Sequence, residues 1–111
     1  MTHAELKALT DDEINRRIAT EVMGWTLKDT DYYHAGRWYK RHGADWKPAI
    51  DDNDMRLVRD ELGRRGLIVQ FKYHLRWSIV REIDDEWKLW NATARQQAEA
   101  ALLAVQKEPT T

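Results

Sequence analysis

The sequence contains no cysteine, so disulfide bonds, thiolate metal sites and thiol catalysis are all excluded. It also has almost no net charge, because 18 lysines and arginines face 19 aspartates and glutamates. A general polyanion binder neutralises several phosphates at once, and this charge balance argues against that class. Long apolar runs are missing too. We therefore expect no signal peptide and no contact with a membrane, and a location in the cytoplasm of a bacterial host cell.

Aromatic residues, by contrast, are plentiful, with six tryptophans, four tyrosines and one phenylalanine among 111 residues. Disordered chains are poor in such residues. The hydrophobic fraction of 42% is enough for one buried core, whereas the length leaves no room for two independent cores. The sequence therefore predicts a single α+β domain that is ordered from about residue 10 to residue 106 and has flexible ends.

Three helices are predicted from their capping residues and their apolar spacing. Thr10 and Glu13 form a capping box before the first helix, and Gly24 suits a left-handed C-terminal cap. Thr93 and Gln96 form a similar box before the last helix. The expected helices cover about residues 11–23, 53–65 and 94–106.

A three-stranded sheet is expected between the second and third helices. Residues 67–73 alternate with a period of two, as a half-buried strand does, and the same alternation returns over 77–82. An Asp84-Asp85 turn then leads into residues 86–90. Such short connections favour an antiparallel meander. The predicted fold is an α/β/α sandwich-like domain with the order α, strand or loop, α, β, β, β, α.

Residues 25–50 show neither the apolar spacing of a helix nor the alternation of a strand. They nevertheless hold six of the eleven aromatic side chains. Residues 25–27 and 37–40 could be short strands joined by a turn, or both could be loop. A stretch this long in a small domain is usually functional or ordered by its own side chains. It is therefore the segment of greatest interest for function.

The order of elements and three local strings resemble the phage ABA sandwich domain, a family of small phage and prophage proteins. The likeness extends over about residues 13–105. Its strings are Glu21-Val22-Met23-Gly24-Trp25, Asp52-Asn53-Asp54-Met55, and Asn91-Ala92-Thr93-Ala94 with the alanine-rich residues 100–104 after it. The resemblance implies an origin in a phage or prophage. It implies no catalytic residues, because the family has no assigned function.

The irregular segment also supplies the candidate ligand-binding residues. Aromatic faces beside basic groups can stack bases and hold phosphates. The alternative interpretation is that Trp25, Trp38 and Trp46 fill the space between helices and sheet while the cations are solvated. The candidates are Tyr33, Arg37, Trp38, Tyr39, Lys40, Arg41 and Trp46.

No catalytic or metal-binding pattern competes with this segment. Asp51, Asp52 and Asp54 lack the glycine and the further ligands of a calcium loop, and helix capping explains Asp52 without a metal. The four histidines show no metal-binding spacing. We therefore predict neither an enzyme nor a bound cofactor or metal.

The sequence favours a phage or prophage accessory protein that acts by binding. The expected partner is a phage or host protein, or a second copy of the chain in a homodimer. A nucleotide ligand, sequestered as a counter-defence, is the first alternative. Single-stranded nucleic acid is the second alternative, and salt dependence of its affinity would identify it.

Overall fold

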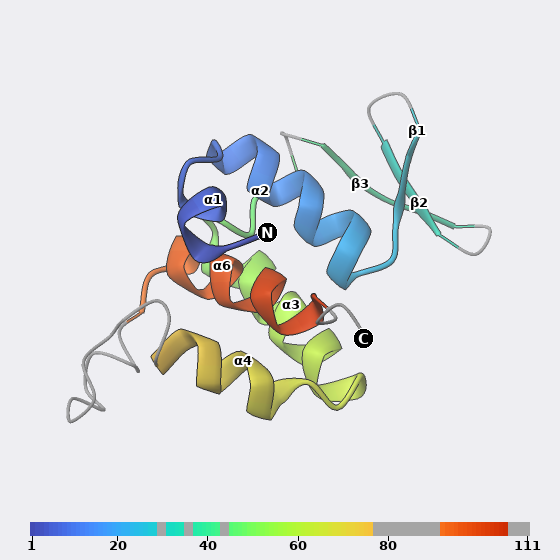
Figure 1. The fold of residues 1–111 in the computed structure, drawn as a ribbon. Helices are drawn as coiled ribbons and strands as arrows, with labels where there is room; N and C mark the ends of the chain where they lie inside the picture. The colour runs from blue at the N-terminus through green and yellow to red at the C-terminus, as the bar shows by residue number, and fades with distance from the viewer. Residues whose placement is uncertain (29–30, 35–36, 43–44, 77–91, 107–111) are drawn as a thin grey trace.

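The computed structural model describes residues 1–28, 31–34, 37–42, 45–76 and 92–106. The helices form a body, and a small sheet stands at one end of it (Figure 1). In chain order the elements are α1 (His3–Lys7), α2 (Asp11–Arg17), the π-helical segment η1 (Ile18–Val22), β1 (Thr26–Lys28), β2 (Asp31–His34), β3 (Arg37–Arg41), α3 (Asp52–Arg64), α4 (Ile68–His74) and α6 (Ala94–Val105).

The α+β class is confirmed, whereas the expected number of three helices is not. Within the described ranges the chain forms five α-helices and η1, because α1 and α4 add to the three predicted helices. Helix α1 contributes Leu6, which is 1% exposed, to the core. The core therefore begins before residue 10.

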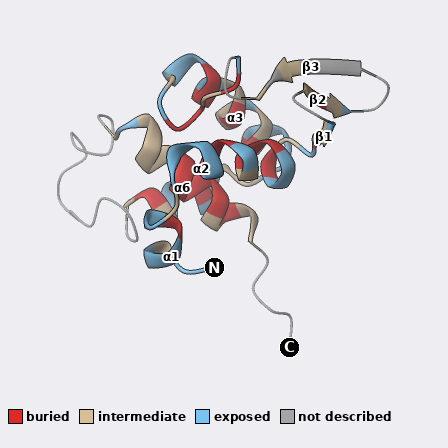
Figure 2. Ribbon diagram, turned by 90° about the horizontal axis from the view of Figure 1, so that it is seen from above, coloured by how far each residue is buried: buried red, intermediate tan, exposed pale blue. Residues whose placement is uncertain are grey.

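Helix α6 lies at the centre of the helical body and packs against α1, α2, η1, α3 and α4 (Figure 1). Figure 2 shows α6 coloured mainly as buried, as its residues 98–102 and 104 are. Small side chains let the surrounding helices approach closely, and Ala98, Ala100 and Ala101 have no exposed surface. The capping box of Thr93 and Gln96 at its N-terminus is confirmed, with each side chain bonded to the other's backbone N–H.

The first predicted helix is confirmed as α2 and its continuation η1. The Thr10 hydroxyl accepts the backbone N–H of Glu13 at 3.1 Å. Gly24 has a φ of 74°, in the left-handed region that glycine adopts without strain. Helix α2 continues as the π-helical segment η1. At the end of η1 the guanidinium of Arg65 donates to the carbonyl oxygen of Val22 at 2.9 Å.

The second predicted helix is confirmed as α3. Its buried stripe is formed by Met55, Val58 and Leu62, which have no exposed surface. The helix ends in a Schellman motif, because the N–H of Leu67 donates to the Leu62 carbonyl at 2.8 Å. Gly66, with a φ of 73°, provides the left-handed residue of this motif.

The predicted strand over residues 67–73 is wrong, because these residues belong to helix α4. In a strand, Val69, Phe71 and Tyr73 would share one face. In α4, Phe71 is buried with Leu75, one helical turn away, whereas Val69 is 76% and Tyr73 is 60% exposed. A short apolar run fits both the strand period of two and the helical period of about 3.6 residues. Packing against α6 selects the helix. The other two predicted strands, 77–82 and 86–90, lie outside the described residues.

The sheet forms instead in residues 26–41, the segment for which the sequence allowed either short strands or a loop. Strands β1, β2 and β3 are antiparallel in the order β1-β2-β3. Tyr33 lies opposite Thr26 on β1 and opposite Trp38 on β3, and Tyr32 lies opposite Leu27. Residues opposite each other across an antiparallel pair share a face. We call the face of Leu27 and Tyr32 the inner face and the face of Thr26 and Tyr33 the outer face.

Candidate functional site

The inner face of the sheet is anchored in the core by three aromatic side chains. Trp25 is 8% exposed, and Tyr32 and Trp46 have no exposed surface. The ring centroids of Trp25 and Trp46 are 4.6 Å apart, and those of Trp25 and Tyr32 are 5.8 Å apart. The indole N–H of Trp46 donates to the backbone carbonyl of Asn15 on α2 at 3.0 Å. These contacts fasten the sheet to α2.

A second link between the sheet and α2 passes through His42. The hydroxyl of Tyr32 lies 2.5 Å from Nδ1 of His42, and Nε2 of His42 lies 2.9 Å from Oδ1 of Asp12. Burial raises the pKa of Tyr32 to about 12, so the hydroxyl stays protonated at neutral pH and can donate to Nδ1. The Nε2 contact has the distance of an ion pair without the direction of a hydrogen bond. A buried phenol with a raised pKa is a poor nucleophile, so the arrangement serves as a structural link.

The buried carboxylate of Asp54 holds the end of the sheet to α3. Its Oδ1 accepts from the ammonium group of Lys40 at 2.9 Å, and its Oδ2 accepts the backbone N–H of Lys47 at 2.8 Å. The Asp54 side chain is 6% exposed and that of Lys40 is 33% exposed. Both carboxylate oxygens are therefore bonded, as a buried charge requires.

The outer face carries one aromatic ring and one basic group that the core does not use, those of Tyr33 and Lys28. The ammonium of Lys28 lies 4.3 Å from the centre of the Tyr33 ring, in a cation–π contact. The backbone register adds Trp38 opposite Tyr33 and places Arg41 opposite Asp31. Tyr33 is half-buried, whereas Thr26 and Lys28 are exposed.

The structure thus divides the predicted candidate residues between two environments. Trp46 is a core residue and not a surface ligand-binding residue, as the alternative interpretation of the segment predicted. Lys40 is bound to Asp54, while Tyr33 lies on the outer face. The other candidates lie on β3, where the backbone alone is described: Arg37, Trp38, Tyr39 and Arg41.

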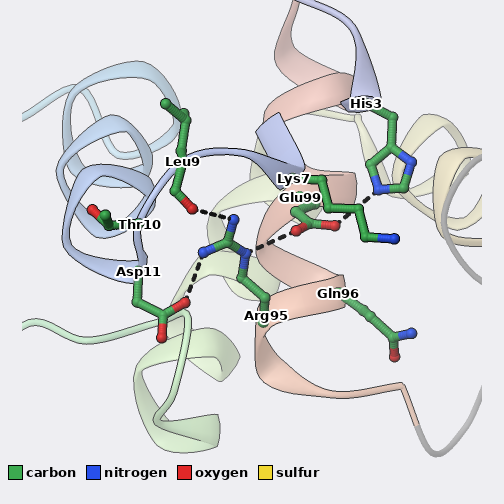
Figure 3. Close-up of a pocket in the computed structure, with 8 residues that line it drawn as sticks. All are labelled: His3, Lys7, Leu9, Thr10, Asp11, Arg95, Gln96 and Glu99. Carbon is green, nitrogen blue, oxygen red and sulfur yellow. Dashed lines mark hydrogen bonds and ion pairs between the residues drawn. The ribbon is translucent and has the colours of Figure 1, made fainter. Parts of the chain in front are cut away.

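A separate polar cluster lines a cleft of about 480 Å³ between α1, the start of α2 and α6 (Figure 3). At its centre, Arg95 donates from Nε to Glu99 at 2.8 Å and from Nη1 to Asp11 at 2.7 Å. Its Nη2 donates to the backbone carbonyls of Leu6 and Leu9 at 2.9 and 2.8 Å. The Glu99 carboxylate also contacts Nε2 of His3 at 2.9 Å. Arg95 therefore joins three helical segments.

Sequence reasoning missed this cluster, and it missed that the carboxylates of Asp54 and Glu99 are buried. The only local signal is the spacing of Arg95 and Glu99, which puts them one turn apart on a helix. Their partners His3, Leu6 and Asp11 lie more than 80 residues away in the chain. Local spacing cannot reveal such contacts.

Comparison with protein-family models, curated proteins and solved structures finds no match to this chain. The resemblance to the phage ABA sandwich domain therefore stays a prediction. Among the residues that the structure describes, no three histidine, aspartate or glutamate side chains gather as metal ligands. In the same ranges no helix is long and apolar enough to cross a bilayer.

Proposed function

We propose that this chain acts by binding a partner protein through the outer face of its sheet. The observation that supports the proposal is the division of the aromatic residues between the two faces. Trp25, Tyr32 and Trp46 hold the inner face in the core, which leaves Tyr33 with Lys28 on the outer face. Folding alone does not require a tyrosine ring on the outer face, whereas tyrosine side chains are enriched where proteins bind partners.

A protein partner fits this face better than a polyanion does. Asp31 lies opposite Lys28 on the outer face, so an acidic and a basic group are adjacent there. Mixed charge gives specificity for a complementary protein surface but opposes a phosphate backbone. The resemblance adds that the partner would be a phage or host protein, and a second copy of the chain is a further candidate.

A photo-crosslinking experiment tests this proposal in bacterial cells. The crosslinker p-benzoylphenylalanine replaces Tyr33 on the outer face or, as a matched aromatic control, Tyr73 on α4. We expect protein adducts from position 33 and none from position 73. An adduct of twice the 13.2 kDa chain mass would identify a homodimer. Adducts from position 73 alone, or from neither position, would contradict the proposal.

A nucleotide or single-stranded nucleic acid is the second candidate ligand, and the Lys28–Tyr33 contact favours it. Bases stack on such rings while cations hold the phosphates. If this candidate is right, the adduct from position 33 would be sensitive to nuclease or carry a nucleotide mass. Affinity for a labelled oligothymidylate would then fall steeply between 50 and 200 mM salt, by roughly tenfold or more for a few phosphate contacts.

A further inference from the structure

A cleft of about 320 Å³ lies where the end of η1, the sheet and α3 meet. Its apolar wall is made by Met23, Trp25 and Leu57. The volume is at the lower end of the roughly 300–1,000 Å³ typical of ligand sites. It therefore suits one side chain of a partner better than an extended ligand.

The charges around this cleft are not balanced. Lys40 is already neutralised by Asp54, since its ammonium lies 2.9 Å from Oδ1. Arg64 is neutralised by Glu61, with its Nε 2.8 Å from Oε1. Asp60 lines the same cleft, is exposed, and makes no ion pair with any residue in the described ranges. The group left to attract a ligand is therefore an anion.

We infer that the cleft binds a basic side chain of the partner protein, a lysine or an arginine. The aliphatic stem would pack against Met23 and Leu57, and the cationic head would lie between the Trp25 indole and the Asp60 carboxylate. Indole is the strongest cation–π partner among the aromatic side chains. Long basic side chains combine such an apolar stem with a charged end. This inference rests on the proposed function, because it names a group of the protein partner.

Methyl NMR with three small probes tests the inference without the partner. The probes are the N-acetyl methylamides of lysine, norleucine and glutamate, which share a backbone and differ in charge. The chain has three methionines, at positions 1, 23 and 55. Met23 lines the cleft, while Met55 is buried in the core and Met1 is at the N-terminus. We expect the lysine probe to shift the Met23 methyl signal in a saturable way and to leave the other two unchanged.

The order of the three probe affinities shows whether the cleft prefers a positive charge. We expect lysine to bind more tightly than norleucine, and glutamate to bind most weakly. Asp60→Asn should weaken lysine binding about two- to fivefold and leave norleucine unchanged, as expected for one exposed ion pair. Asp52→Asn, which removes an exposed carboxylate at the other end of α3, is the matched control and should change neither affinity.

Other results would overturn the inference. Norleucine binding as tightly as lysine would show that charge plays no part, and the absence of any Met23 shift would show that the cleft takes no such group. These outcomes leave the outer-face proposal intact, because crosslinking at Tyr33 measures it separately. Conversely, lysine binding in the cleft would persist even if the outer face gave no adduct.

Discussion

Arg95→Lys tests how much the central guanidinium contributes to stability. The side chain is 22% exposed and makes four hydrogen bonds, two to carboxylates and two to backbone carbonyls. Lysine keeps the charge but not the planar fork, and its shorter reach cannot satisfy Asp11, Glu99 and the two carbonyls together. The variant therefore separates the geometry of this group from its charge.

The expected cost follows from the bonds that lysine loses. A hydrogen bond to a charged group contributes about 1.5–3 kcal/mol. Losing two such bonds, reduced for partial exposure, gives a destabilisation of about 2 kcal/mol. Arg95→Gln should cost about 3–4 kcal/mol, because it also leaves the buried Glu99 carboxylate without its guanidinium. Either value is a large fraction of the roughly 5–15 kcal/mol that stabilises a domain.

Urea unfolding followed by circular dichroism measures these free energies. For a chain of this size, 2 kcal/mol corresponds to a fall in melting temperature of roughly 8 °C. Arg64→Lys is the matched control, because that guanidinium is 74% exposed and, among the residues that the structure describes, pairs with Glu61 alone, so we expect no resolvable change. Adding Glu99→Gln to Arg95→Gln should recover at least about 1 kcal/mol. If Arg95→Lys unfolds at the same urea concentration as the wild type, the reasoning is refuted.

Three further changes test other parts of the structure. Because burial raises the pKa of Tyr32 from 10.0 to about 12, its contribution to stability is present below pH 10 and is lost as the pH rises towards 12. Absorbance titration at high pH should show one late tyrosine that Tyr32→Phe removes, and a single common transition would refute the burial. Gly66→Ala should destabilise by about 1 kcal/mol through its positive φ, whereas Gly63→Ala inside α3 should stabilise by about 0.5–1 kcal/mol, and thermal melts that show no difference in sign would contradict the left-handed cap. Asp54→Ala should destabilise by about 2–3 kcal/mol in urea unfolding, because it leaves the N–H of Lys47 without its acceptor.

The helix boundaries show how far local chemistry determines this fold. Thr10 and Thr93 at the N-caps and the left-handed glycines Gly24 and Gly66 act within a few residues, so the sequence alone marks where α2 and α6 begin and where η1 and α3 end. Only Thr93 has the full capping box, because the Glu13 carboxylate accepts from the Thr10 hydroxyl and not from the Thr10 backbone N–H. The buried stripe of α3 is equally local, because it depends only on the helical period. These signals mark the helices only, because the strand predicted over residues 67–73 is helix α4 and the sheet lies in residues 26–41.

Other features depend on contacts between distant parts of the chain. The alternation of residues 67–73 suits a strand, yet packing of Phe71 and Leu75 against the core makes a helix, since seven residues cannot separate the two periods. Likewise, the aromatic segment does not itself reveal which of Tyr32 and Tyr33 is buried. That choice depends on which face of the sheet meets α2, and one residue of register would reverse it.

The sequence by itself determined the positions of three helices and the segment in which aromatic and basic residues concentrate. Only the tertiary structure decided that Trp46 belongs to the core and that Tyr33 lies on the outer face. It alone placed Arg95 among partners more than 80 residues away and left Asp60 at the rim of a cleft without an ion pair among the described residues. The physical reason is range, because capping acts within one helical turn, whereas burial and ion pairing depend on which distant segments the folded core brings together.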